Sequence, residues 1–179
     1  MAEGSNIKPQ NLKNENSFAP TSSEVDHRKI GIDHELFFFH EYSPGSAFWL
    51  PNGTKIYGKL MSFIRDEYIK RGFQEVQTPV IAKEELWEIS GHAKEYKDDM
   101  FYLEKNSDDS SQYAMKPMQC PLHCLMFKYR NRSYKELPLR LADFGSLHRN
   151  ELSNTLRGLF RGKKFTQDDA HVFCTYDQI

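Results

Sequence analysis

Two β-strand segments near the end of the sequence restrict the fold more than any other feature. They are LPLRLADFGSLHRNE (residues 137–151) and KFTQDDAHVFC (164–174), joined by the loop LSNTLRGLFRGK (152–163). Side chains alternate between the two faces of a strand, so one face of the second segment carries Phe165, Gln167, Asp169, His171 and Phe173. Polar and ionisable groups at intervals of ~7 Å suit the wall of a ligand cleft better than a packed core.

The rest of the sequence predicts further strands and helices around this hairpin. An apolar stripe at helical spacing predicts an amphipathic helix from Ile56 to Arg71, with Gly72 at its C-terminal cap; the stripe is Tyr57, Leu60, Met61, Ile64 and Tyr68. Upstream, SPGSAFWLPNG (43–53) is expected to be extended and to end in a Pro-Asn-Gly turn. FQEVQTPVI (73–81) is a predicted strand interrupted at Pro79, and EELWEISG (84–91) is a predicted short helix.

DMFYL (99–103) and QYAMKPM (112–118) are predicted strands around a polar turn, and a helix is predicted to begin at CPLHCLMFKYRNR (120–132). Residues 1–25 contain little to bury and are expected to be a disordered tail. Residues 26–179 are then one domain of the α+β class, an antiparallel sheet flanked by helices.

The composition excludes some partners. The net charge of -1 gives no overall attraction to polyanions, so an anion site must come from local placement of cations. No apolar run approaches the ~20 residues of a membrane helix, so no membrane partner is expected. The first residues lack the pattern of a secretory or transit peptide. Three cysteines without such a signal point to a reduced, cytoplasmic setting.

Cys120 and His171 are candidate metal ligands. Cys120 lies at the start of a predicted helix, whose positive end is expected to lower the pKa of its thiol. Thiolate and imidazole both suit Zn²⁺, but two ligands are fewer than even a catalytic zinc site requires. A small buried cysteine is the alternative, because free cysteine is among the most buried residue types.

The run HRNE (148–151) and the loop after it could bind a nucleotide. Arg149 and Glu151 share a strand face, and a guanidinium fork can hold phosphate oxygens while a carboxylate accepts from an exocyclic amine. The loop adds the cations Arg157, Arg161, Lys163 and Lys164. A solvated surface hairpin with chance ion pairs is the alternative.

Several segments together resemble a known family. PMQCP, LADFGSLHRNE, LRGLFRGKKF and TQDDAHVFCT, with HRKIGIDHELFFFHEYSPGSAFWLPNG upstream, are similar to the catalytic core of threonyl-tRNA synthetase. This is a class II aminoacyl-tRNA synthetase, and the sequences of these segments are most similar to the eukaryotic cytosolic form. The resemblance covers about residues 27–179. It implies a class II synthetase-like antiparallel sheet that ends before motif 3.

The resemblance also implies roles for individual residues. The helix 56–71 and the following strand match motif 1, the homodimer interface, and residues 139–174 match motif 2, the ATP hairpin. Within motif 2, the ATP-binding positions are Arg149 (α-phosphate, the catalytic contact), Glu151 (adenine amine), Phe165 (stacking) and Arg161 (γ-phosphate, with Mg²⁺ nearby). Cys120 and His171 match two of three zinc ligands. Met118, Gln167 and Asp169 match positions around threonine, with Asp169 accepting its hydroxyl.

The implied function is ATP-dependent activation of threonine and its transfer to tRNA(Thr). Zn²⁺ would improve the discrimination of threonine from valine. An apolar pocket prefers threonine only ~10²-fold, whereas a site that binds its hydroxyl reaches a preference of ~10⁴-fold. The third zinc ligand, motif 3 and the anticodon-binding and editing domains have no match in these 179 residues, so we expect the chain alone to be inactive. The alternative is a non-catalytic synthetase-like binding or dimerisation module. A reading frame that continues past Ile179 into motif 3 would favour the enzyme.

Overall fold

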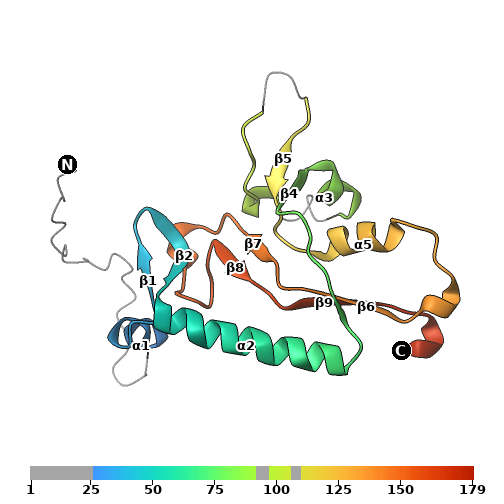
Figure 1. Cartoon of the computed structure of the whole chain (residues 1–179). Helices are drawn as coiled ribbons and strands as arrows, with labels where there is room; N and C mark the ends of the chain where they lie inside the picture. Colours follow the sequence, from blue (N-terminus) through green and yellow to red (C-terminus); the bar gives the residue numbers. More distant parts are fainter. Residues whose placement is uncertain (1–25, 92–96, 106–109) are drawn as a thin grey trace, which may run out of the picture.

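The computed structural model describes residues 26–91, 97–105 and 110–179, and a long β-hairpin runs through its centre (Figure 1). The predicted tail, residues 1–25, lies outside the described residues. One arm of the hairpin is β6 (Leu139–Asp143) and β7 (Ser146–His148), and the other is β8 (Lys164–Thr166) and β9 (Asp169–Phe173). β6 pairs with β9 and β7 with β8, both antiparallel, as the sequence predicts.

The two halves of the hairpin form one ladder without a change of register. Asp143 pairs with Asp169 and Ser146 pairs with Thr166, so two residues separate the halves on each arm. Between them the Gln167 amide donates to the Gly145 carbonyl at 3.3 Å. Beyond β7, the Arg149 amide donates to the Lys163 carbonyl at 2.9 Å in the same register. The alternation of faces predicted for residues 165–173 therefore continues through the interruption.

Helices lie on opposite sides of this hairpin (Figure 1). On one side α2 (Pro51–Lys70) is held by the Tyr68 hydroxyl, which donates to the Asp168 carbonyl at 2.8 Å, and by Arg65 over the Phe144 ring. On the other side α5 (Cys120–Lys128) packs on β9, and the Phe127 ring stacks on Phe173 at 4.4 Å. Asp169, His171 and Phe173 therefore face α5.

Shorter elements complete the domain around the hairpin and the two helices. The short strand β3 (Gln74–Glu75) adds to β6 in parallel, the exception to antiparallel pairing among the described residues. The other elements are α1 (His27–Asp33), β1 (Phe37–His40), β2 (Ser43–Trp49), β4 (Ile81–Lys83), α3 (Glu85–Ile89) and β5 (Tyr113–Met115), with 3₁₀ turns at Lys97–Asp99, Tyr134–Glu136, Ser153–Thr155 and Tyr176–Gln178. β1 pairs with β2 and β4 with β5, and a small core of Trp87, Met100 and Ala114 lies beside β5.

Several predicted element boundaries differ from the structure. The predicted strand 73–81 is two strands, β3 and β4, separated around Pro79. DMFYL contributes an isolated bridge from Tyr102 to Ala114, because its first residue, Asp99, ends a 3₁₀ turn; the polar turn that follows lies partly outside the described residues. The α5 helix ends at Lys128, four residues before the predicted segment ends.

The Pro-Asn-Gly sequence at residues 51–53 is the first turn of α2, and the prediction of a turn outside the helix was wrong. Proline is favoured in a first helical turn, where its missing N–H costs nothing. Gly53 is buried there, and a Cβ at this position would lie 1.9 Å from the Leu36 carbonyl oxygen. The glycine therefore permits a close approach of two backbones. The C-terminal prediction is confirmed, because Gly72 follows the helix with a φ of 72°.

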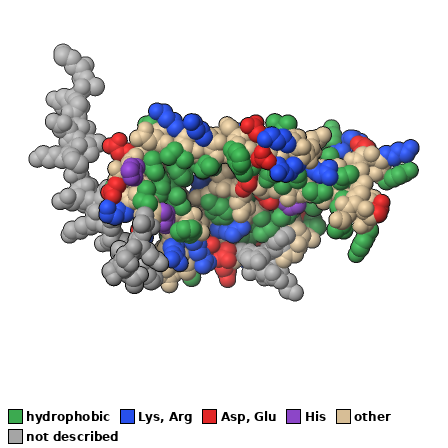
Figure 2. Space-filling view, turned by 90° about the horizontal axis from the view of Figure 1, so that it is seen from below, with side chains coloured by type: hydrophobic (Ala, Val, Ile, Leu, Met, Phe, Trp, Pro, Cys, Tyr) green, Lys and Arg blue, Asp and Glu red, His purple; other side chains and the backbone are tan. Residues whose placement is uncertain are grey.

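The α2 helix leaves much apolar surface in contact with solvent. Tyr57, in the predicted apolar stripe, packs on Trp49. A second stripe, Ile56, Leu60 and Phe63, is 50–61% exposed, although Leu60 was predicted to lie in the first. We call these three residues the α2 apolar stripe. Figure 2, which views the molecule from the α2 side, shows hydrophobic side chains spread over this face.

Candidate functional site

Three groups able to bind a metal meet where α5 begins against β9. The ligand atoms of Cys120, Asp169 and His171 all lie within 4.8 Å of one another, and the three side chains are half buried. Cys120 is the first residue of α5, while Asp169 and His171 are two residues apart on the β9 face that points at α5. The predicted ligands Cys120 and His171 are therefore brought together. Sulfur, imidazole and carboxylate donors match the preferences of Zn²⁺.

Asp169 was predicted to accept the threonine hydroxyl, and the structure places it beside the two candidate metal ligands, Cys120 and His171. If the hydroxyl of a bound amino acid approaches the metal, a carboxylate at this position can contact both the metal and the hydroxyl. The carboxylate is thus a candidate third metal donor as well as a candidate hydroxyl acceptor.

The predicted effect of the helix end on Cys120 was wrong for the metal-free protein. Burial and the nearby Asp169 carboxylate raise the pKa of the Cys120 thiol above its usual range, and a backbone hydrogen bond at the helix start opposes them only in part. Low dielectric surroundings and a like charge both disfavour the thiolate. A metal ion must therefore displace the thiol proton when it binds.

His171 makes a hydrogen bond that the sequence does not predict. Its Nδ1 lies 2.7 Å from Nδ1 of His123, a side chain on α5 that is fully buried. With Nδ1 engaged, Nε2 is the nitrogen that remains for a metal. Burial lowers the pKa of His171, which favours the neutral ring that a metal requires.

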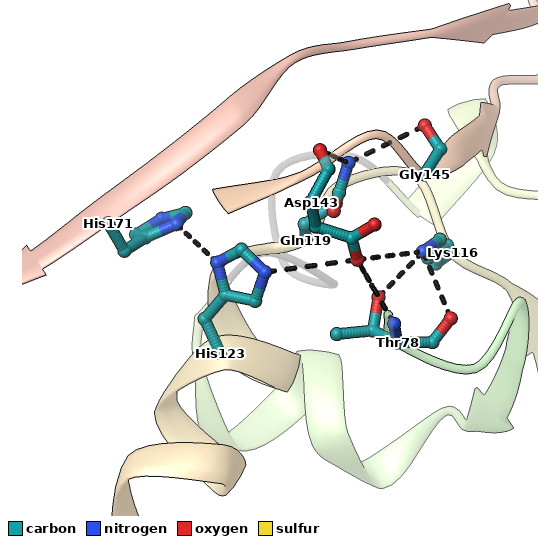
Figure 3. Close-up of polar contacts among 7 residues, drawn as sticks. All are labelled: Thr78, Lys116, Gln119, His123, Asp143, Gly145 and His171. Atoms are coloured by element: carbon teal, nitrogen blue, oxygen red, sulfur yellow. Dashed lines mark hydrogen bonds and ion pairs between the residues drawn. The ribbon is translucent and has the colours of Figure 1, made fainter. Parts of the chain in front are cut away.

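Behind the two histidines lies a buried polar network (Figure 3). One Asp143 carboxylate oxygen accepts from the Thr78 amide at 3.1 Å and from the Thr78 hydroxyl at 2.7 Å. Lys116 donates to the same hydroxyl at 2.7 Å, and its Nζ lies 3.8 Å from that carboxylate oxygen. Gln119 donates to the Asp143 and Gly145 carbonyls at 3.4 and 3.5 Å. These contacts join the segment before α5, the end of β6 and the residues around Thr78.

Burial and hydrogen bonds oppose each other in this network. Burial alone raises the pKa of Asp143, but the nearby His123 ring, the hydrogen bonds from Thr78 and the charge of Lys116 hold it below the usual range. Burial lowers the pKa of Lys116 more than Asp143 raises it. The Lys116 and Asp143 side chains are 1% and 2% exposed, so each charge depends on the other.

At the other end of the hairpin, the predicted ATP-binding residues lie in two pairs. The Arg149 guanidinium lies over the Phe165 ring, 5.1 Å from its centroid, and its Nε donates to the Pro117 carbonyl at 3.2 Å. Arg161 forms an ion pair with Glu151 at 2.7 Å, with Arg161 largely exposed and Glu151 largely buried. To bind all four residues, a nucleotide would stack its base on Phe165 in place of the Arg149 guanidinium. Its exocyclic amine would replace Arg161 as the partner of Glu151.

The remaining predicted residues lie between these ends. Gln167 is exposed at the interruption between β8 and β9, and its backbone is fixed by the hydrogen bond to Gly145. Met118 is half buried on the short segment that connects β5 to α5. Gln167 lies between Phe165 and Asp169 in the sequence, and Met118 lies between Pro117, whose carbonyl accepts from Arg149, and Cys120.

Sequence patterns did not predict the five buried polar residues behind His171, which are Thr78, Lys116, Gln119, His123 and Asp143. The available signal was a charged residue in an apolar strand, as in YAMKPM and RLADF. Such a charge indicates a buried partner, because isolated charges are rarely buried. The sequence does not reveal which partner, since Lys116 and Asp143 come from different elements.

None of the helices in the described part of the chain has the length and apolarity needed to cross a membrane.

Comparison with known proteins identifies the family of this chain. Residues 101–179 match the model of the tRNA synthetase class II core domain (G, H, P, S and T). Cytoplasmic threonine–tRNA ligase 1 of Rattus norvegicus is 58% identical over 96% of this chain and 24% of its own length. The cytoplasmic threonine–tRNA ligase of Saccharomyces cerevisiae is 56% identical over 90% of the chain and 22% of its own length.

A solved structure has the same fold. The crystal structure described as the RNA binding domain of threonyl-tRNA synthetase from Cryptosporidium parvum Iowa II superposes with a TM-score of 0.82 at 53% identity. The match covers 87% of this chain and 38% of that chain. The present chain thus spans about a quarter of the length of the curated relatives. With its class II core fold and this degree of identity, the chain belongs to the threonyl-tRNA synthetase family, of the cytosolic eukaryotic type.

Proposed function

We propose that this chain supplies the ATP- and threonine-binding face of a threonine–tRNA ligase that transfers threonine to tRNA(Thr). The observation that carries the proposal is the order of groups along one hairpin face. Phe165 with Arg149 stands at one end, and Asp169 and His171 with Cys120 stand at the other. An aminoacyl-adenylate needs a base site, a phosphate site and an amino-acid site in that order.

The nucleotide end supports phosphate chemistry. Attack of the threonine carboxylate oxygen on the α-phosphorus of ATP forms the mixed anhydride and releases pyrophosphate. Arg149 would stabilise the charge that develops on the α-phosphate, and Arg161 would pair with the γ-phosphate and its Mg²⁺. Phe165 would stack on adenine, and Glu151 would accept from its amine once Arg161 has moved.

The other end supports recognition of the threonine hydroxyl. Cys120 and His171 would hold a Zn²⁺ ion, which supplies a Lewis acid for the amino group and hydroxyl of threonine; valine lacks the hydroxyl. Asp169 lies close enough to both ligands to accept from that hydroxyl. Gln167 and Met118 would border the amino acid between the metal and the phosphate.

Replacing Arg149 by alanine tests the nucleotide end. We expect a nonhydrolysable threonyl-adenylate analogue to bind with an affinity lower by ~10- to 10²-fold, because a hydrogen bond to a charged group contributes ~1.5–3 kcal/mol. Isothermal titration calorimetry measures the affinity, and Arg130→Ala, at an exposed arginine paired with Glu136, is the control. Equal affinity for wild type and Arg149→Ala would contradict the proposed site.

The α2 apolar stripe supports the proposal that the chain is a homodimer. Three large apolar side chains, Ile56, Leu60 and Phe63, follow one another at i, i+4 and i+7, and each is at least half exposed. An apolar stripe of this kind marks a surface that another chain covers. The stripe lies on the helix that the sequence matches to motif 1.

Phe63→Glu is expected to weaken self-association. A charge placed at a buried aromatic contact removes at least ~2 kcal/mol, so the dimer dissociation constant should rise by ~30-fold or more. Sedimentation velocity over a concentration series gives this constant. Ser62→Glu adds the same charge on a different side of α2 and should leave it nearly unchanged. A monomeric wild-type protein at every concentration would contradict the dimer.

A further inference from the structure

The short contact between His123 and His171 requires a defined proton arrangement. Two imidazole nitrogens 2.7 Å apart form a hydrogen bond only when one donates and the other accepts. With both rings neutral, one histidine carries its proton on Nδ1 and the other carries it on Nε2. The contact by itself permits either assignment.

The surroundings of His123 favour one of the two assignments. Its Nε2 has no hydrogen-bond partner within the described residues, and the nearest charged group is Asp143 Oδ2, at 3.8 Å. A carboxylate only accepts, so a proton on Nε2 is favoured and a bare nitrogen there would face a negative charge. His123 Nδ1 is then the acceptor, and His171 must donate from its own Nδ1.

Several contacts hold the Asp143 carboxylate in place beside His123. The oxygen nearest His123 also accepts from the amide and hydroxyl of Thr78, and Lys116 balances its charge at 3.8 Å. Both charged side chains are almost fully buried. The carboxylate is therefore held beside His123: Thr78 donates to it on one side, and His123 Nε2 faces it at 3.8 Å on the other (Figure 3).

We propose that His123 is a positioning residue that sets the tautomer of His171, so that His171 presents a bare Nε2 to a metal ion, and that Asp143 sets the tautomer of His123. The role of His123 in metal binding rests on the proposed metal centre. A neutral histidine in solution prefers its proton on Nε2, which would block the ligand atom. The buried chain reverses that preference before any metal arrives.

Imidazole ¹⁵N spectroscopy tests the tautomer without metal. In the metal-free wild-type protein we expect His171 to carry its proton on Nδ1 and His123 to carry it on Nε2. In His123→Phe, which keeps a ring but removes both nitrogens, His171 should change to the Nε2–H form. A wild-type His171 already in the Nε2–H form would overturn the inference.

Two amide substitutions provide a matched pair for zinc affinity. The substitution His123→Asn places a side-chain amide near the former Nδ1, where it can accept from His171, whereas His123→Gln places the amide near the former Nε2, where it cannot. Competition with a chromogenic chelator should show zinc affinity reduced ~10- to 100-fold in His123→Gln and His123→Phe and by less than ~10-fold in His123→Asn. Equal losses in all three variants would indicate packing alone and overturn the inference.

The outcome also separates this inference from the proposed function. Wild-type protein with the expected tautomers, but with zinc affinity no greater than that of Cys120→Ser, would remove the metal centre and leave the tautomer assignment standing. Wild-type protein that binds zinc through Cys120 while His123→Phe binds it equally well would keep the metal centre and overturn the role of His123.

Discussion

Replacing Asp143 by alanine is expected to lower the free energy of unfolding by ~3–5 kcal/mol, because removal of one partner leaves a buried charge without compensation. The Lys116 side chain is 1% exposed, and Asp143 is the acidic group beside it. The substitution also removes the acceptor of the Thr78 amide and hydroxyl. Urea denaturation followed by circular dichroism measures the loss.

A double substitution shows whether the cost comes from the unpaired charge. Lys116→Met combined with Asp143→Leu should recover most of the stability, because apolar residues of similar volume replace a buried ion pair at little cost. Asp33→Ala, which breaks the exposed Lys29–Asp33 pair, should change stability little. A loss in Asp143→Ala no larger than that in Asp33→Ala would show that the buried pair does not stabilise the fold.

Replacing Cys120 by serine is expected to abolish stable zinc binding and most of the preference for threonine over valine. A neutral hydroxyl is a much poorer zinc ligand than a thiolate, and Cys120 supplies the sulfur of the metal-binding group. The ratio of affinities for threonyl- and valyl-adenylate analogues should fall from ~10⁴ toward ~10², the limit of an apolar pocket. Atomic absorption after gel filtration and calorimetry with the two analogues provide the measurements.

Cys124→Ser is the matched control, because Cys124 lies one helical turn further along α5 and is exposed. Zinc content and analogue preference should remain at wild-type values in this variant. The contribution of Arg149 to nucleotide binding should also survive in Cys120→Ser, since the Arg149–Phe165 pair lies at the other end of the hairpin. Unchanged zinc content and unchanged preference in Cys120→Ser would rule out the ligand role.

The hairpin and its site face could be predicted from the sequence because local periodicity determines them. Alternation along a strand places Asp169 and His171 on one face whatever lies around them. The start of α2 was harder to predict. Proline and glycine at residues 51–53 suit a turn and a first helical turn equally well, and the close contact between Gly53 and Leu36 decides between them.

The network behind His171 could not be predicted, because its members meet only through tertiary packing. His123 precedes His171 by 48 residues, and Thr78 precedes Asp143 by 65. The pKa of Cys120 was missed for a similar reason. The helix end acts locally, whereas the burial and the Asp169 carboxylate that outweigh it come from the folded chain.

The constant register of the β6–β9 and β7–β8 ladders fixes the distances between residues along the hairpin. Phe165 and His171 are six residues apart, which at ~3.3 Å per residue fixes a span of ~20 Å between the base end and the metal end. Inserting or deleting one residue within either arm would turn every later side chain to the opposite face. The loop at residues 152–163 lies outside the two ladders, so its length does not affect these distances. Length changes among related chains should therefore collect in that loop and spare the arms.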